Sequence, residues 1–579
     1  MTEEHPETSF VKSFFAGVID EEAIVPFPEA TRAERERVES LRAELAASLE
    51  GLDPARVDRE GALPDGLLER LARIGLMGLG VPVEHGGMGL STSSVARIFE
   101  DVGAADASLA VTLVVHHGLV VRPLVRFGTE AQRRRHLPAL ASGRCLGAFA
   151  LTEAGAGSDA GSLTTRATLT DDGSGYVLDG VKIWVTNGRW AELFLVFART
   201  SPLDGSLKPR VTAFLVERAM GAQTGAEEPR MGLRGLSVTA LRLENLHVPP
   251  GAVLGEAGRG FRVAMEAMSE ARIPYAAACL GACRRLLALA SARAVERRAF
   301  ARPLSDLGMI REKLAAMACE IHALEAATYL TAGMVDAGVA DWAVEAALCK
   351  LLASRTLWTC ADEALQIAGG AGYLCDYPYE RMLRDARAGA LFLGTNEVLR
   401  AFVALAGMQG PGRQLAEVAR AMREPIKGFG VLGEFALRRA RSAFGRERLE
   451  RVHPALRREA VVFEDGVAAL ARECERTLRK HGTDIAEMQF VQHRIADVAL
   501  DLYAIAASLS QTTLRIERRG PDNAREDVEL CAGFVELASR RLHERLSKME
   551  REEDELMKQI ARRCCERARR PSEGPPPTR

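Results

Sequence analysis

The hydrophobic period of this sequence changes twice, and those changes limit the folds that it can adopt. From about residue 30 to 142 the pattern is helical, and in LLERLARIGLMGLG (67–80) apolar residues recur at the spacing of one helix face. Residues 147–255 instead hold short runs rich in β-branched and aromatic residues, which are typical of strands. The helical pattern returns over 258–565. This sequence pattern therefore predicts an α+β fold, mostly α, in which helices flank a central β domain.

Breaks in the pattern set the predicted boundaries. Inside the β region, Asp179-Gly180 lies between two β-rich runs and predicts a two-residue hairpin turn. The segment 541–563 carries charges at i,i+4 spacing and predicts a solvated helix. The predicted domains are an N-terminal helical domain at 30–146, a central β domain at 147–255, a helical bundle at 258–410, an additional helical domain at 411–565 and a disordered tail at 566–579.

Charge and cysteine usage exclude several kinds of function. The 76 Lys and Arg residues nearly balance the 78 Asp and Glu residues, so no net positive field indicates a nucleic-acid partner. The 11 cysteines are scattered without a CxxC pair, so we expect neither a disulfide framework nor a metal site. Uninterrupted apolar runs such as Leu113–Val115 are too short to span a bilayer, and the polar start MTEEHPETSF differs from a signal peptide. We expect a cytoplasmic protein.

Two motifs at the start of the β region could hold a ligand. In LTEAGAGSDAGS (151–162) close glycines let backbone N–H groups approach an anion, and Ser158 adds a hydroxyl donor. The alternative is an ordinary loop in which Asp159 caps a turn. In KIWVTNG, strand alternation places Trp184 and Thr186 on one face, which suits a flat heteroaromatic ring. The alternative is a core tryptophan with its N–H satisfied.

Three later motifs are similarly ambiguous. In ERRAFARPLSD (296–306), Arg297 and Phe300 could hold a phosphate and an adenine, but a solvated basic helix end is equally ordinary. The glycines around Gly370 interrupt a helical pattern, which indicates a turn or a close backbone approach. LFLGTNEVLR (391–400) places a polar turn between apolar runs, and such a turn either joins two elements or presents a residue to a ligand.

Taken together, these strings resemble one protein family. TEAGAGSD, KIWVTNG, RAFARPL, QIAGGAGY, YERMLRDAR and GTNEVLR, in this order, are similar to the signatures of the acyl-CoA dehydrogenases, over about residues 10–560. The helical region after residue 411 and SFVKSFFAG (9–17) resemble the very-long-chain branch. The resemblance implies FAD-dependent α,β-dehydrogenation of long-chain acyl-CoA thioesters in fatty-acid β-oxidation. It also implies a homodimer, an electron-transferring flavoprotein as acceptor, and peripheral membrane contact, for which 431–448 is the candidate segment.

The resemblance assigns ligands to individual positions. In the family, one chain holds the flavin ring and pyrophosphate, and a neighbouring subunit holds the adenine end. The thioester and the CoA portion are expected at Ser158, Arg272, Leu393 and Gly394. For FAD, the matching positions are Leu151, Thr152, Gly157, Ser158, Trp184 and Thr186, with Arg297, Phe300, Gln366 and Gly370 for its adenine end and Thr395 as a second adenosine contact.

One position departs from the family in a way that affects catalysis. The family reaction removes a proton from C2 while C3 passes a hydride to the flavin, so it needs a carboxylate base and donors on the thioester carbonyl. The usual glutamate position is Leu393, and the position used in a few branches is Ala271. Glu270 and Glu397 are the remaining candidates, although Glu270 is rotated by about 100° from position 271 around its helix. The alternative function is a flavin- and acyl-CoA-binding paralogue with a scaffold role, or a different flavin-dependent substrate.

Overall fold

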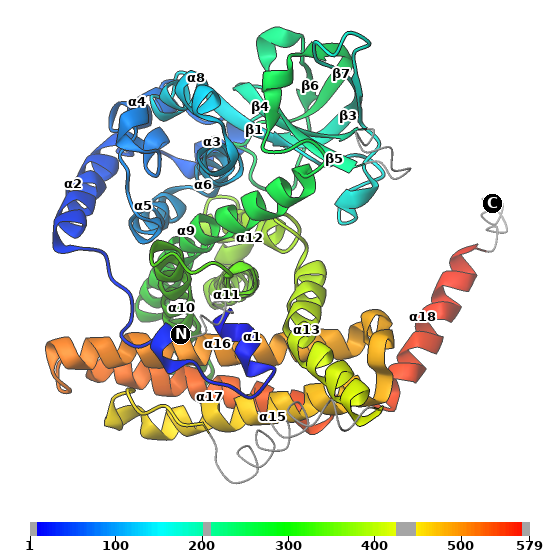
Figure 1. The fold of residues 1–579 in the computed structure, drawn as a ribbon. Helices are drawn as coiled ribbons and strands as arrows, with labels where there is room; N and C mark the ends of the chain where they lie inside the picture. The colour runs from blue at the N-terminus through cyan, green and yellow to red at the C-terminus, as the bar shows by residue number, and fades with distance from the viewer. Residues whose placement is uncertain (1–8, 201–209, 424–446, 570–579) are drawn as a thin grey trace, which may run out of the picture.

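The computed structural model describes residues 9–200, 210–423 and 447–569. Figure 1 shows N-terminal helices beside a β domain, a helical bundle beneath both, and a further layer of long helices at the base. The N-terminal part forms α1 (Phe10–Phe14), α2 (Arg32–Ser48), α3 (Pro54–Glu60), α4 (Leu67–Arg73), α5 (Thr92–Ala105), α6 (Ala107–Val114), the π-helix η4 (Val115–Val121), α7 (Arg122–Phe127) and α8 (Glu130–Ala141).

The β domain is one mixed sheet. Its strand order is β6-β7-β3-β2-β4-β5-β8, and β1 pairs with β4. The pairs β1–β4 and β2–β4 are parallel, and the other pairs of this sheet are antiparallel. The strands are β1 (Leu146–Ala150), β2 (Arg166–Leu169), β3 (Tyr176–Thr186), β4 (Ala191–Thr200), β5 (Arg210–Glu217), β6 (Gln223–Glu227), β7 (Val238–Val248) and β8 (Val253–Leu254).

The predicted hairpin at Asp179-Gly180 is wrong. These two residues lie inside the continuous strand β3, where the pairing with β7 shifts register between Leu178 and Gly180. A Cβ at position 180 would overlap Thr165. The glycine therefore permits a close approach at a bulge, which is the other common use of glycine in a strand.

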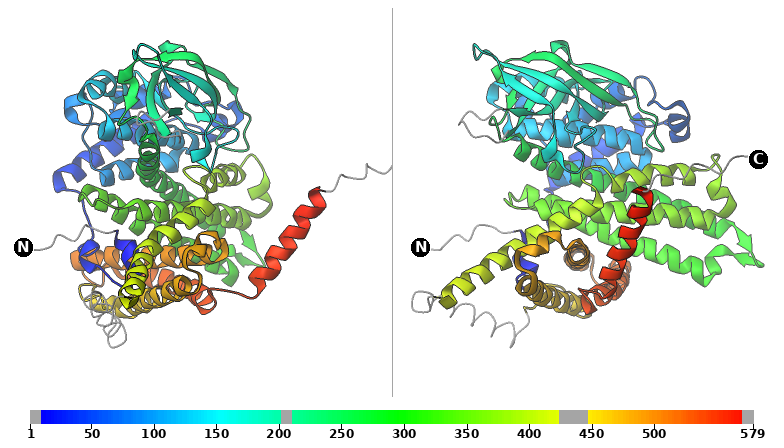
Figure 2. Two further views of the ribbon diagram at one scale, coloured as in Figure 1. Left: turned by 45° about the vertical axis from the view of Figure 1, so that its right-hand side comes forward. Right: turned by 90° about the vertical axis from the view of Figure 1, so that its right-hand side faces the viewer.

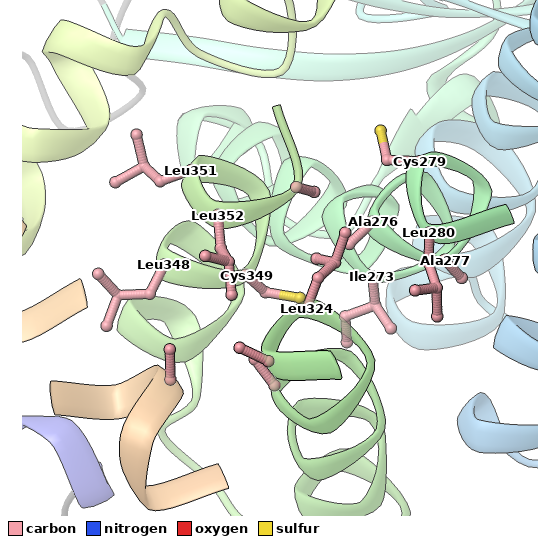
Figure 3. Packing of buried hydrophobic residues seen from close by; sticks show 14 of the residues in the cluster. Ile273, Ala276, Ala277, Cys279, Leu280, Leu324, Leu348, Cys349, Leu351 and Leu352 are labelled. Atoms are coloured by element: carbon pink, nitrogen blue, oxygen red, sulfur yellow. The ribbon is translucent and has the colours of Figure 1, made fainter. Parts of the chain in front are cut away.

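Long helices make the bundle and the additional domain. The bundle contains α9 (Gly260–Glu296), α10 (Gly308–Asp336), α11 (Ala343–Ala368), α12 (Pro378–Arg387) and α13 (Asn396–Arg423), with the small hairpin β9 (Arg298–Ala299) and β10 (Arg302–Pro303) between α9 and α10. Buried side chains of α9, α10 and α11, such as Ile273, Leu324 and Leu348, meet in its core (Figure 3). The last described helices are α15 (Arg457–His481), α16 (Gln489–Arg519), α17 (Arg525–Ser547) and α18 (Glu553–Arg569).

The helical boundaries differ from the predicted ones. Helix α13 continues through the predicted boundary at 410–411, so the bundle and the additional domain share a helix. Helix α18 extends into the predicted tail and projects away from the rest of the molecule (Figure 2). The segment predicted to contact a membrane, 431–448, lies outside the described residues except for its last two.

Buried contacts join the additional domain to the bundle. Asp501 of α16 is fully buried and meets three guanidinium groups, at 3.3 Å from Arg355, 2.9 Å from Arg541 and 3.1 Å from Arg545. The prediction of a continuous solvated helix over 541–563 is therefore wrong at its first turns. Arg541 and Arg545 turn inward because a buried carboxylate needs cationic partners.

Two stretches, Ala107–Phe127 and Gly260–Glu296, have the length and apolar composition of membrane-spanning helices, although their apolar runs are interrupted. Both lie mostly inside the folded chain, with 89% and 72% of the most apolar window buried. Helices that pass through the centre of a large domain have the same composition, since they contact apolar neighbours on every side. We read both as core helices.

Candidate functional site

The turn between α12 and α13 has an unusual backbone. Leu393 is 8% exposed and adopts a left-handed conformation (φ 55°), and Gly394 follows at φ 89°. Left-handed geometry is unfavourable for a leucine, so neighbouring structure must hold it. Thr395 directly precedes α13, and its hydroxyl accepts a hydrogen bond from the N–H of Val398 at 3.3 Å. Within the described residues the N–H of Leu393 has no acceptor, so this buried turn presents a free donor.

Two buried basic side chains, Arg272 and Lys350, donate hydrogen bonds to carbonyl oxygens of the turn. Arg272 of α9 donates through Nε to the carbonyl oxygen of Leu393 at 3.3 Å. Lys350 of α11 donates through Nζ to the carbonyl oxygen of Gly394 at 2.8 Å and to Oδ1 of Asn396 at 2.9 Å. Burial lowers the pKa of Arg272 to about 10, and burial together with Arg272 lowers the pKa of Lys350 to about 7. In the described part of the chain, neither side chain forms a salt bridge with a carboxylate, and the charge of Glu397 favours the charged form of Lys350.

The carboxylates of the two candidate bases, Glu270 and Glu397, do not lie beside Leu393. Glu270 is buried, but its carboxylate points to the N-terminal domain, where it contacts Arg122 at 3.1 Å and Arg126 at 3.6 Å. Glu397 is exposed on the first turn of α13. Among residues that the structure describes, we therefore find no carboxylate placed to accept a proton beside Leu393.

The second family position for a base is closed by packing. Ala271 is fully buried against the π-helix η4, where a Cβ built on Gly118 would lie 2.6 Å from the Ala271 Cβ. A longer side chain at this buried position would have to displace closely packed neighbours. Of the two family positions for a base, position 393 is the less tightly packed.

A cavity lies beside the turn. It is enclosed by α5, α6, α9, α11 and α12, and apolar side chains such as Val111, Leu357, Met382 and Phe392 line most of it. Its polar lining is already used by the fold, since Asp385 accepts a hydrogen bond from the N–H of Leu233 at 2.6 Å. An apolar cavity of this kind can hold an aliphatic chain.

Hydrogen bonds hold the segment that follows β1, and the glycine loop after this segment is exposed. Lys182 donates to the carbonyl oxygen of Leu151 at 3.1 Å and to Glu153 at 2.7 Å. Burial would raise the pKa of Glu153, but its hydrogen bonds from Lys182 and from Thr164 and Thr165 lower it to about 2. Beyond this anchor the backbone of Thr152 accepts from Ile183 at 2.9 Å. In the loop that follows, Gly157 and Ser158 are exposed, as an anion-binding loop requires.

Trp184 is not a core tryptophan. It is 63% exposed and has a left-handed backbone (φ 54°) at a second irregularity in the pairing of β3 with β7. This bulge interrupts the regular alternation that placed Trp184 and Thr186 on one face in the prediction. Thr186 is half-buried. A strained, exposed indole presents its face for stacking, so the ligand-binding interpretation is favoured over the core interpretation.

The predicted adenine-binding residues are also exposed. Phe300 is 86% exposed at the tip of the β9–β10 hairpin, with φ 52°. Ala301 follows at φ 63°, a conformation that favours glycine. Arg297, Gln366 and Gly370 are exposed as well. A fully presented aromatic ring on a hairpin suits contact with a second molecule.

Some residues of the site were not found from the sequence. Lys350 is a single lysine in the apolar run AALCKLLAS, and a lone charge in a buried helix pattern could have indicated a functional partner. Lys182 and Glu153 belong to motifs that were considered, but their pairing joins residues 29 positions apart. Only the folded arrangement shows that they hold the glycine loop. No group of histidine, cysteine or acidic side chains with metal-binding geometry occurs in the described residues.

Comparison with known families gives the same organisation. Family models match as "Acyl-CoA dehydrogenase, N-terminal domain" at 31–144, "middle domain" at 148–246 and "C-terminal domain" at 258–408. A fourth model, "ACAD9/ACADV, C-terminal domain", matches 454–570. The chain belongs to the acyl-CoA dehydrogenase family.

Individual relatives place it within the very-long-chain branch. The human mitochondrial very long-chain specific acyl-CoA dehydrogenase is 35% identical over 94% of this chain and 84% of that protein. The crystal structure of an acyl-CoA dehydrogenase complexed with FAD from Bacillus anthracis superposes with a TM-score of 0.78 at 28% identity, covering 95% of this chain and 94% of that one. Butyryl-CoA dehydrogenase from Megasphaera elsdenii covers 65% of this chain at 34% identity, with a TM-score of 0.61.

Proposed function

We propose that this chain is an FAD-dependent acyl-CoA dehydrogenase that acts on long acyl chains in β-oxidation. One observation carries the proposal: the strained turn at Leu393 presents a free backbone N–H beside an apolar cavity. A thioester oxygen at this N–H would leave the acyl chain to enter the cavity. The names of the relatives favour dehydrogenation over a purely binding role.

The residues of this chain would act on the substrate in distinct ways. The N–H of Leu393 would bind the thioester oxygen, and the nearby cations of Arg272 and Lys350 would stabilise negative charge that develops there. FAD, when bound, supplies the acceptor for the C3 hydride. Leu393 itself cannot accept the C2 proton. Loss of a general base lowers a rate by about 10²–10⁴-fold, so turnover of simple acyl-CoA thioesters should be slow.

The proposal includes a homodimer and an external electron acceptor. The 86% exposure of Phe300 on a strained hairpin supports a role in a second subunit. An electron-transferring flavoprotein is the acceptor expected for this family. We also propose a cytoplasmic location with peripheral membrane contact.

The function can be tested with purified protein. We expect the protein to be yellow and to contain one FAD per chain. Under anaerobic conditions, palmitoyl-CoA should perturb the flavin band on mixing, because thioester binding changes the polarity around the ring, and the band should then bleach slowly. A colourless protein that takes up no FAD would contradict the proposal, as would an unperturbed flavin band. A perturbed band that never bleaches would support the binding paralogue.

Replacing Lys182 by methionine should weaken FAD binding. The change removes the donor that fixes the carbonyl of Leu151 and the carboxylate of Glu153, and so loosens the glycine loop. Hydrogen bonds to charged groups contribute about 1.5–3 kcal/mol, so we expect the Kd for FAD to rise by about tenfold or more. Fluorescence titration of the apoprotein measures it. Lys558→Met on an exposed helix is the control, and equal affinities in the two variants would contradict the assigned role.

FAD binding should quench the fluorescence of Trp184 selectively. The chain has four tryptophans, and the 63% exposed indole of Trp184 is the one that we place against the flavin. Trp184→Phe should therefore remove most of the quenching that follows FAD addition to the apoprotein. Trp358→Phe, which removes another partly exposed indole, should leave the quenching largely intact. The reverse result would place the flavin elsewhere.

A further inference from the structure

Because no carboxylate lies at position 393, the site suits a thioester whose oxidation does not require removal of a proton from C2. We propose that the preferred substrate is a 2-carboxyacyl thioester, an acyl-CoA that carries a carboxylate on C2, and that it is oxidised with loss of CO2. This inference rests on the proposed function and names the substrate class of the same site.

The electron balance of this reaction requires no proton acceptor. In simple dehydrogenation, the electron pair of the C2–H bond becomes available only when a base removes the proton. In a 2-carboxyacyl thioester the C2–carboxylate bond breaks instead, CO2 leaves, and the electron pair remains on C2 and is delocalised onto the thioester oxygen. A double bond then forms between C2 and C3 as a hydride leaves C3, and FAD, when bound, would supply the acceptor for that hydride. The products are a 2-enoyl thioester and CO2, and the two electrons of the C3 hydride would pass to bound FAD.

The side chain at position 393 suits a leaving carboxylate. The family resemblance places this residue on the side of C2 from which a base would approach, and the group that leaves C2 must lie on that same side. Leu393 is buried, and the ring of the neighbouring Phe392 packs against Tyr275 at 4.9 Å between centroids. A carboxylate becomes neutral as it leaves as CO2, so an apolar, water-poor contact favours the transition state over the charged ground state.

The charges around the turn suit an anionic substrate. Arg272 and Lys350 lie behind the turn without a carboxylate partner among the described residues. Glu270 does not offset this charge because it is bound to Arg122, whereas the exposed Glu397 acts on Lys350 and offsets part of it. The positive field would stabilise the enolate oxygen that forms as CO2 leaves. A glutamate at position 393 would instead place a like charge beside the C2 carboxylate.

The turn keeps its shape although its usual side chain is absent. Leu393 remains in the left-handed region, which costs a residue with a Cβ on the order of 1–2 kcal/mol. Arg272 donates to the carbonyl oxygen of Leu393, and Lys350 donates to the carbonyl oxygen of Gly394 and to Oδ1 of Asn396. The chain thus preserves the carbonyl-binding geometry while removing the base, which is the combination that decarboxylation needs.

Two thioesters of matched chain length test the inference. The FAD-loaded protein is mixed anaerobically with 2-carboxyhexadecanoyl-CoA or with palmitoyl-CoA, and flavin bleaching and CO2 release are followed together. We expect the 2-carboxy thioester to bleach the flavin at least about 10²-fold faster, with one CO2 released per flavin reduced. Bleaching by palmitoyl-CoA at an equal rate would overturn the inference. So would perturbation of the flavin band by the 2-carboxy thioester without CO2 release.

Variants at position 393 separate this inference from the proposed function. Leu393→Glu should lose its advantage for the 2-carboxy thioester, whereas Leu393→Met, which is apolar and of similar volume, should retain it. FAD content and the midpoint of thermal unfolding confirm that each variant is folded. If both thioesters perturb the flavin band but Leu393→Glu bleaches with the same preference for the 2-carboxy thioester as the unmodified protein, this inference fails and the proposed function stands. If neither thioester perturbs the flavin, the proposed function fails.

Discussion

Replacing Leu393 by glutamate is expected to accelerate flavin reduction by palmitoyl-CoA by about 10²–10⁴-fold, the usual contribution of a general base. The turn already offers the free N–H of residue 393 and the cations of Arg272 and Lys350. These cations favour the ionised form of an introduced carboxylate, which is the form that accepts a proton. Anaerobic stopped-flow absorbance of the flavin band measures the rate directly.

A matched variant controls for the change in size and polarity. Leu393→Gln introduces a side chain of the same length as glutamate that cannot accept the C2 proton. It should bind palmitoyl-CoA and perturb the flavin band without a gain in rate. The account would be contradicted if the glutamate variant retained FAD and bound the thioester but reduced the flavin no faster than the glutamine variant.

Replacing Asp501 by alanine should have the largest effect on stability. Asp501 is fully buried and meets Arg355, Arg541 and Arg545 at 2.9–3.3 Å. Removing one partner of a buried ion pair costs about 3–5 kcal/mol, because the remaining charges stay buried without compensation. Glu320 contacts Arg355 and Arg541 but cannot neutralise all three guanidinium groups. Urea unfolding followed by circular dichroism measures the loss.

An exposed ion pair on α17 provides the control for the buried Asp501 cluster. Glu529 pairs with Arg525 at i,i+4 on α17, and both side chains are largely exposed. Glu529→Ala should change the free energy of unfolding by less than about 1 kcal/mol, as for surface ion pairs in general. Equal losses in the two variants would show that the Asp501 cluster does not join the additional domain to the bundle.

The additional domain also reaches the functional turn. Arg400 lies near the start of α13, close in sequence to Leu393. It contacts Asp497 of α16 at 2.7 Å. Helix α13 begins at Asn396, which Lys350 holds. The domain therefore supports the helix that carries the turn, and loss of the Asp501 cluster should weaken that support.

Much of the fold could be predicted from the sequence, because hydrophobic period is a local property. The order of helices, β domain and helices is confirmed by the structure and by the family matches. The hairpin at Asp179-Gly180 was wrong because a glycine that permits a bulge has the same local signature as one in a turn. The inward position of Arg541 was missed because only its distant partner, Asp501, shows why it is buried.

The site was predictable at the level of motifs and less so at the level of contacts. The exposure and strained backbone of Trp184 and Phe300 agree with their predicted roles, which remain predictions. Lys350 could not be assigned, since a single lysine in a helix has no characteristic spacing. Its contact with the carbonyl of Gly394 joins residues 44 positions apart. Long-range contacts of this kind depend on tertiary packing and leave no periodic signal.

The exchange of the C2 proton tests the central claim most directly. Palmitoyl-CoA is incubated anaerobically with the FAD-loaded protein in D2O, and deuterium at C2 is measured by mass spectrometry. Because no carboxylate lies at position 393, the account predicts exchange about 10²-fold or more slower than in the Leu393→Glu variant. Exchange by the unmodified protein at the rate of that variant would show that another group removes the proton, and would contradict the account.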